Sequence, residues 1–73
     1  MNQATMTDWM ALASARFPKC AARRRISGSG RFALGVREPE PHVILFESEA
    51  KRRRAIERTD CEFDLFDLRL EQE

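Results

Sequence analysis

The chain has 73 residues, which is the size of one small domain, and its net charge at pH 7 is +1. Hydrophobic residues make up 42% of it and charged residues 34%, so we expect a folded domain with a densely charged surface rather than a disordered tail. The longest apolar run, residues 43–46, is far shorter than the roughly 20 residues that cross a bilayer. The first fifteen residues do not have a basic start followed by an unbroken apolar stretch, so we expect no signal peptide. We therefore expect a cytoplasmic protein without a membrane partner.

Residues 7–17 have the spacing of an amphipathic helix. Thr7 suits the N-cap, Asp8 suits the positive end of the helix dipole, and Pro18 predicts that the helix ends at Phe17. Trp9 is interpreted as a core anchor. Apolar side chains recur along one stripe of this helix: Met6, Met10, Ala13 and Phe17.

Two short segments of different character follow the proline. Residues 19–26 are predicted to form either a short second turn of helix or a basic arm. Residues 27–30 read Ser-Gly-Ser-Gly and are predicted to be a flexible linker. Their G-x-G spacing can hold phosphate where it follows a strand and opens a helix, but here it precedes a strand, so we interpret it as a hinge.

Two strands are predicted next. Residues 31–37 alternate, with Phe32, Leu34 and Val36 on a buried face, while Ala33 and Gly35 are small enough for the first helix to pack closely on the other face. Residues 38–41 turn the chain. Residues 42–47 form a second strand, which we expect to be covered on both faces because residues 43–46 are all apolar, and the pair is predicted to be an antiparallel hairpin.

A second long helix is predicted over residues 49–59, with Ser48 as its N-cap. Its apolar face is thin and contains Arg52, so we expect Arg52 to lay its stem along the edge of the core and to send its guanidinium outward. Residues 62–70 are predicted to form a third strand with a bulge near residues 65–66, because the apolar positions change phase there. A short helix is the alternative for this segment.

The predicted fold class is therefore α+β, with an N-terminal amphipathic helix followed by a β-β-α-β module and a three-stranded, mostly antiparallel sheet. A single domain spans residues 1–73, with the N-terminal helix and basic arm in residues 1–30 and the module in residues 31–73. The third strand is placed either parallel beside the second or antiparallel beside the first. This plan is common among small regulatory or inhibitory proteins of bacteria and phages, an analogy of architecture alone.

The charge is unevenly distributed along the chain. Residues 1–37 contain seven basic residues and one acidic residue, a net charge of +6, whereas residues 38–73 contain six basic and eleven acidic residues, a net charge of −5. Eleven of the thirteen basic residues are Arg, the side chain best suited to bidentate contacts with carboxylate or phosphate. We predict a partner-binding surface made of basic side chains: Arg16, Lys19, Arg23, Arg24, Arg25, Arg31, Lys51, Arg54 and Arg58.

Two functions fit such a surface. The first is a protein-interaction module, a small regulator or inhibitor that binds an acidic or nucleic-acid-mimicking surface of a partner protein. The second is direct binding of nucleic acid, with the arginines on phosphates. Carboxylates in residues 62–73 would repel a phosphate backbone on a shared face, which favours a protein partner, with self-association between basic and acidic surfaces as a subcase. Alternatively, the arginines only pair with neighbouring acids, such as Glu49 with Arg53.

Catalysis and metal binding have little support in the sequence. His42 is the only histidine, and nothing near it indicates a nucleophile, so we expect no enzyme. Cys20 and Cys61 lie far apart and outside any C-x-x-C pair, so we expect neither a metal nor a cofactor. The two cysteines are interpreted as semi-buried thiols in a reducing compartment, with a disulfide between them as the alternative.

Overall fold

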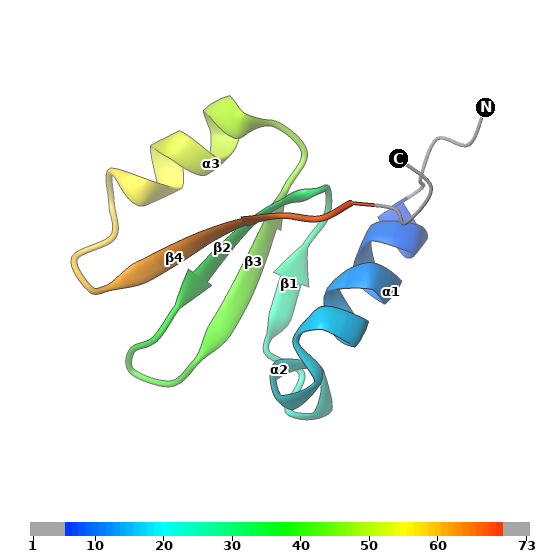
Figure 1. Cartoon of the computed structure of the whole chain (residues 1–73). Helices are drawn as coiled ribbons and strands as arrows, with labels where there is room; N and C mark the ends of the chain where they lie inside the picture. The colour runs from blue at the N-terminus through cyan, green and yellow to red at the C-terminus, as the bar shows by residue number, and fades with distance from the viewer. Residues whose placement is uncertain (1–5, 70–73) are drawn as a thin grey trace.

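The computed structural model describes residues 6–69, which form three helices and one four-stranded sheet (Figure 1). The elements follow in the order α1 (Met6–Arg16), α2 (Pro18–Ala22), β1 (Ile26–Gly28), β2 (Phe32–Val36), β3 (His42–Phe46), α3 (Glu49–Ile56) and β4 (Phe63–Asp67). The strand order is β1-β3-β2-β4, with β1 parallel to β3 and the other two pairings antiparallel. The α+β class and the β2–β3 hairpin are confirmed, but the sheet has one strand more than the sequence predicted.

The additional strand is β1, which contains the first half of the predicted linker, residues 27 and 28. The N–H of Val43 donates to the carbonyl of Arg25 at 2.8 Å, and the N–H of Ser29 donates to the carbonyl of Leu45 at 3.2 Å. Gly28 has a φ of 82°, and a Cβ there would lie 2.2 Å from the carbonyl oxygen of Leu45. Glycine is therefore needed for close approach to β3 rather than for a hinge.

The segment after Phe17 forms α2, the helical one of its two predicted forms. Pro18 occupies the first turn, where its missing N–H costs no hydrogen bond. Arg23 is the C-cap, and Arg24 has a φ of 55°, so the chain turns sharply into β1. Thr7 lies within α1 and is therefore not its N-cap.

The last strand, β4, lies antiparallel beside β2, which is the second of the two predicted placements. Its pairing runs without a bulge from Phe63 opposite Val36 to Asp67 opposite Phe32, so the predicted bulge is wrong. The physical reason is that helices lie against both faces of the sheet. Phe66 and Leu68 pack on the α1 side, whereas Phe63 is half-buried and Leu65 stays exposed on the α3 side, so the change of phase in the sequence needs no change of register.

One face of the sheet packs against α1 and α2. The buried residues of this core are Ala13 from α1 and Ala33, Val43, Leu45 and Leu68 from the sheet side. Partly buried apolar side chains pack against them: Trp9, Met10, Leu12, Phe17, Cys20, Ile26 and Phe66.

The small side chains of Ala33 and Gly35 leave room for close packing on this face of the sheet, as the sequence predicted. The ring of Phe66 lies across Gly35, with its Cε2 atom 3.2 Å from where a Cβ would stand. The same ring meets Phe17 edge-on, with the ring centroids 5.2 Å apart.

The other face packs against α3, where Leu34 is 1% exposed. Ser48 caps α3 as predicted, because its hydroxyl accepts the N–H of Lys51 at 3.2 Å.

The prediction for Arg52 is half wrong, since the residue is 6% exposed and its guanidinium turns inward. One nitrogen donates to the carbonyls of Ala33 and Phe66 at 3.3 and 3.1 Å and to Asp67 at 3.1 Å, because these acceptors lie directly beneath the helix.

Both cysteines are free thiols beside the loop that joins β2 to β3. The sulfur of Cys20 lies 3.8 Å from the carbonyl oxygen of Pro41, and that of Cys61 lies 3.9 Å from the carbonyl oxygen of Glu38. Among the helices formed by residues 6–69, none is both long and apolar enough to span a bilayer.

Candidate binding surface

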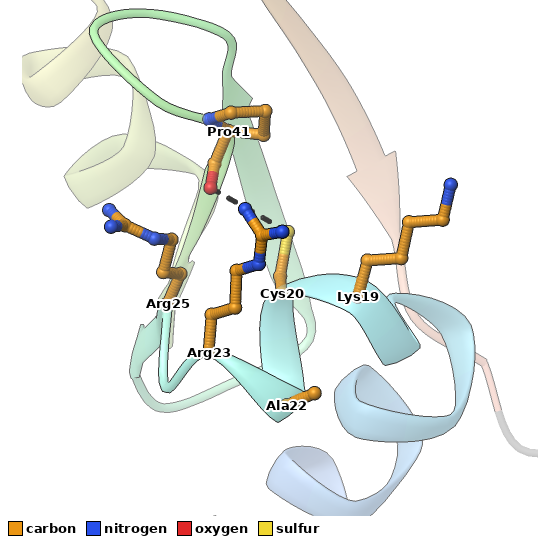
Figure 2. Close-up of a pocket in the computed structure, with 6 residues that line it drawn as sticks. All are labelled: Lys19, Cys20, Ala22, Arg23, Arg25 and Pro41. Atoms are coloured by element: carbon orange, nitrogen blue, oxygen red, sulfur yellow. Dashed lines mark hydrogen bonds between the residues drawn. The ribbon is translucent and has the colours of Figure 1, made fainter.

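A hollow of about 420 Å³ lies where α2, the start of β1 and the β2–β3 loop meet. Figure 2 shows Arg23 beside Cys20 and facing Pro41, with the side chains of Arg25 and Lys19 spreading to either side of it. We call this site the α2 surface and define it by its lining residues: Lys19, Cys20, Ala22, Arg23, Arg25 and Pro41.

The local backbone explains why these three basic side chains gather. Lys19 and Arg23 are four residues apart, so the helical turn of α2 places them on the same side. The left-handed conformation of Arg24 then reverses the chain. Arg25 follows this reversal, and its carbonyl is held by the N–H of Val43.

The basic side chains of the α2 surface differ in how far they are already paired. Arg25 forms an ion pair with Glu40, although both side chains remain partly exposed, and its Nε atom is buried without a hydrogen-bond partner in the described chain. Lys19 and Arg23 are exposed, and neither forms an ion pair with a side chain of residues 9–69. Their charges are therefore available to an anionic partner.

The second predicted basic group lies elsewhere. Lys51, Arg54 and Arg58 are exposed on or just after α3, which packs on the face of the sheet opposite to α1 and α2. Figure 1 shows α3 and α2 on opposite sides of the sheet. The structure therefore gives two separate basic surfaces and does not join them into one. The expected pairing of Glu49 with Arg53 is also not formed as a salt bridge in this part of the chain.

The remaining predicted residues lie outside the α2 surface. Arg24 is exposed beside it, and Arg16, at the end of α1, lines a different hollow near β4. Arg31 is half-buried, with its guanidinium carbon 5.1 Å from the centroid of the Phe32 ring. Arg52 lies 5.4 Å from the same centroid, so Phe32 contacts two guanidinium groups.

Two acidic residues of β4 are neutralised within the chain. Asp64 accepts hydrogen bonds from the Nε and Nη2 atoms of Arg37 at 3.2 and 2.8 Å, and Asp67 pairs with Arg52. The hydrogen bond to Asp64 and the negative charge of that carboxylate raise the pKa of Arg37 above its ordinary value.

The sequence did not indicate the apolar part of the α2 surface. Cys20, Ala22 and Pro41 have no common motif, and Pro41 is brought to α2 only by the pairing of β1 with β3. Among the side chains described, those of residues 9–69, no cluster of His, Cys, Asp or Glu could hold a metal ion. Comparison with models of protein families, with curated proteins and with solved structures gave no match to this chain.

Proposed function

We propose that this chain is a non-enzymatic interaction module whose α2 surface binds an acidic segment of a partner protein. The observation that supports this most is the combination of a basic rim, Lys19, Arg23 and Arg25, with an apolar lining from Cys20, Ala22 and Pro41. Such a hollow suits a segment in which a carboxylate stands beside an apolar side chain. A module of this kind would act as a regulator or inhibitor of its partner.

A phosphate backbone fits this surface less well. Nucleic-acid binding needs several cations along a path of phosphates, whereas the α2 surface is compact and one of its cations, Arg25, is already paired with Glu40. The cations of α3 lie on the opposite side of the sheet and do not extend the path. Direct nucleic-acid binding is still a second candidate, because Arg23 and Arg24 are both exposed and adjacent.

Fluorescence anisotropy separates the two functions. The probes are short labelled peptides that combine Glu or Asp with one Leu or Phe, and single-stranded and double-stranded oligomers of DNA and RNA. We expect acidic peptides to bind at low salt, and Arg23→Ala to weaken that binding about 5- to 10-fold. Arg53→Ala, an exposed arginine on α3, is the matched control and is expected to change nothing.

The opposite pattern would overturn the proposal. If no acidic peptide binds, or if Arg53→Ala weakens binding as much as Arg23→Ala does, the α2 surface is not the site. If the oligomers bind instead, and Arg23→Ala reduces the dependence of log K on log salt by about one unit, the nucleic-acid function replaces it.

A further inference from the structure

β4 is an open edge of the sheet, since in the described chain it pairs only with β2. The opposite edge is β1, which has three residues, against five in β4. An edge strand of ordinary length presents unpaired N–H and C=O groups, and proteins normally protect such an edge with charge, proline or a bulge. β4 contains neither proline nor a bulge.

The hydrogen bonds at the two ends of the β2–β4 ladder show which backbone groups of β4 are unpaired. The N–H of Leu68 donates to the carbonyl of Arg31 at 2.7 Å, and the N–H of Arg37 donates to the carbonyl of Glu62 at 3.4 Å. In an antiparallel ladder the directly bonded pairs alternate, so the even-numbered residues of β4 bond to β2. The outward-facing groups therefore belong to the odd-numbered residues: Phe63, Leu65 and Asp67.

The middle residue of this edge is also its most exposed apolar side chain. Leu65 is 47% exposed, and it is the one large hydrophobic side chain exposed within residues 9–69, where side chains are described. Hollows lie on both sides of it. One, of about 160 Å³, adjoins Ile56 and Arg52 of α3, and the other, of about 520 Å³, adjoins Arg16 and Phe66.

The charges on β4 do not protect the edge. Asp64 is neutralised by Arg37 at 2.8 Å, and Asp67 by Arg52 at 3.1 Å, so two carboxylates that would repel an acidic neighbour are already paired within the chain. An approaching strand with the same sequence therefore meets little net charge.

We propose that β4 pairs antiparallel with β4 of a second copy of this chain, with the two-fold axis at Leu65. This is the register in which strands of residues 63–67 overlap over their full length. Leu65 then faces Leu65 of the second copy, Phe63 faces Asp67, and Asp64 faces Phe66. No carboxylate faces another, whereas an axis at Asp64 or at Asp67 would place two identical carboxylates opposite each other.

The register also agrees with the backbone. The outward-facing groups of Phe63, Leu65 and Asp67 meet the same outward-facing groups of the second copy, so N–H and C=O are paired on both sides. The result is one continuous sheet of eight strands, four from each copy, in which both exposed Leu65 side chains are covered. This surface is distinct from the α2 surface, which lies near the β1 edge.

Sedimentation equilibrium over a range of concentrations tests the proposal. We expect the unmodified protein to dimerise reversibly and without great affinity, because one pair of short strands buries less than the roughly 1,000 Å² of a stable interface. Leu65→Lys is expected to weaken dimerisation at least about 10-fold, because it places two like charges on the axis. Ala11→Lys adds the same charge on an exposed position of α1 and is expected to leave the dimer intact.

Leu65→Pro separates strand pairing from simple apolar association. It keeps an apolar side chain but removes an N–H that faces outward and makes no bond to β2, so the β2–β4 ladder should survive while the dimer is lost. Circular dichroism checks that the variant is folded. If the unmodified protein is a monomer, or if both Leu65 variants still dimerise, the proposal is wrong, even if the edge then accepts a strand of another protein.

A cross-link tests the register without a disruptive substitution. In a Cys20→Ser, Cys61→Ser background, Leu65→Cys places two thiols on the axis, where the Cα atoms of a bonded pair lie about 5.5 Å apart, within reach of a disulfide. Mild oxidation should give a covalent dimer. Glu62→Cys, whose two copies would lie about 20 Å apart along the strands, should not, and cross-linking of both variants alike would contradict the register.

Discussion

The two faces of the sheet are covered in different ways. The face toward α1 and α2 is closed by apolar side chains, among them Ala13, Ala33 and Leu68, each at most 1% exposed. The face toward α3 is closed by a helix whose only buried residue is Arg52. One face is therefore held by nondirectional apolar burial, and the other depends on a buried cation that needs correctly placed acceptors.

The sequence of α3 explains why an arginine, rather than apolar side chains, holds this helix on the sheet. Of its eight residues only Ala50, Ala55 and Ile56 are apolar, so the helix has little surface with which to cover Leu34 and Phe32. The guanidinium of Arg52 lies over the ring of Phe32 and also reaches two backbone carbonyls and Asp67. The attachment of α3 is consequently more sensitive to a single polar group than that of α1.

The largest loss of stability is expected for a substitution on the face of the sheet that packs against α1 and α2. Leu68→Ala removes a side chain that is 1% exposed and leaves a cavity among Ala13, Ala33 and Leu45, so we expect a loss of about 3 kcal/mol in the free energy of unfolding, measured by urea denaturation. Leu65→Ala is the matched control, the same change in the same segment on the α3 face. At 47% exposure it should cost less than about 1 kcal/mol at concentrations that keep the protein monomeric. Equal losses would contradict the assignment of faces.

An intermediate effect is expected for the buried cation. Arg52→Ala removes the three hydrogen bonds to Ala33, Phe66 and Asp67 and uncovers Phe32, so we expect a loss of about 2 kcal/mol in the free energy of unfolding. Arg52→Met should recover part of this loss, because it restores the apolar stem without the charge.

The exposed neighbour Arg53 provides the control for this experiment. Arg53→Ala is expected to change the free energy of unfolding by less than about 0.5 kcal/mol, because its side chain is exposed and forms no ion pair with the side chains of residues 9–69. If Arg52→Ala is as mild as Arg53→Ala, then Arg52 does not hold α3 on the sheet.

Local patterns were sufficient to predict most of the elements. The period of two in residues 32–36, the apolar run at residues 43–46 and the position of Pro18 each correspond to an observed element or boundary. Ser48 was identified as an N-cap because capping depends only on residues within one turn. These features need no information about the rest of the chain.

The predictions that were wrong concern features that depend on residues distant in the sequence. β1 is three residues of Ile-Ser-Gly, a composition typical of a linker, and it is a strand only because β3 lies beside it. The bulge predicted for β4 was unnecessary because Phe66 packs on the α1 side while Leu65 is left exposed on the α3 side, an arrangement that the straight pairing with β2 allows. The inward turn of Arg52 depends on carbonyls of β2 and β4, which a helical wheel does not show.

The candidate site was predictable only in part for the same reason. Charge alone indicated Lys19, Arg23 and Arg25, and the structure brings these three together. It does not bring the α3 cations to them, because the crossover from β3 to β4 places α3 on the other face. The apolar contribution of Pro41 comes from a loop distant in sequence, so no local pattern indicated it.

The smallest effect is expected at the start of α3. Ser48→Ala removes the hydroxyl that accepts the N–H of Lys51, and we expect a loss of about 1 kcal/mol in the free energy of unfolding. Ser27→Ala, at an exposed position in β1, is the control and should cost less than about 0.5 kcal/mol. Because α3 has so little apolar surface, the two substitutions on this face, Ser48→Ala and Arg52→Ala, should both increase hydrogen exchange in α3 more than in α1. If exchange rises equally in both helices, the two faces unfold together, and the different ways in which they are covered have no consequence for local stability.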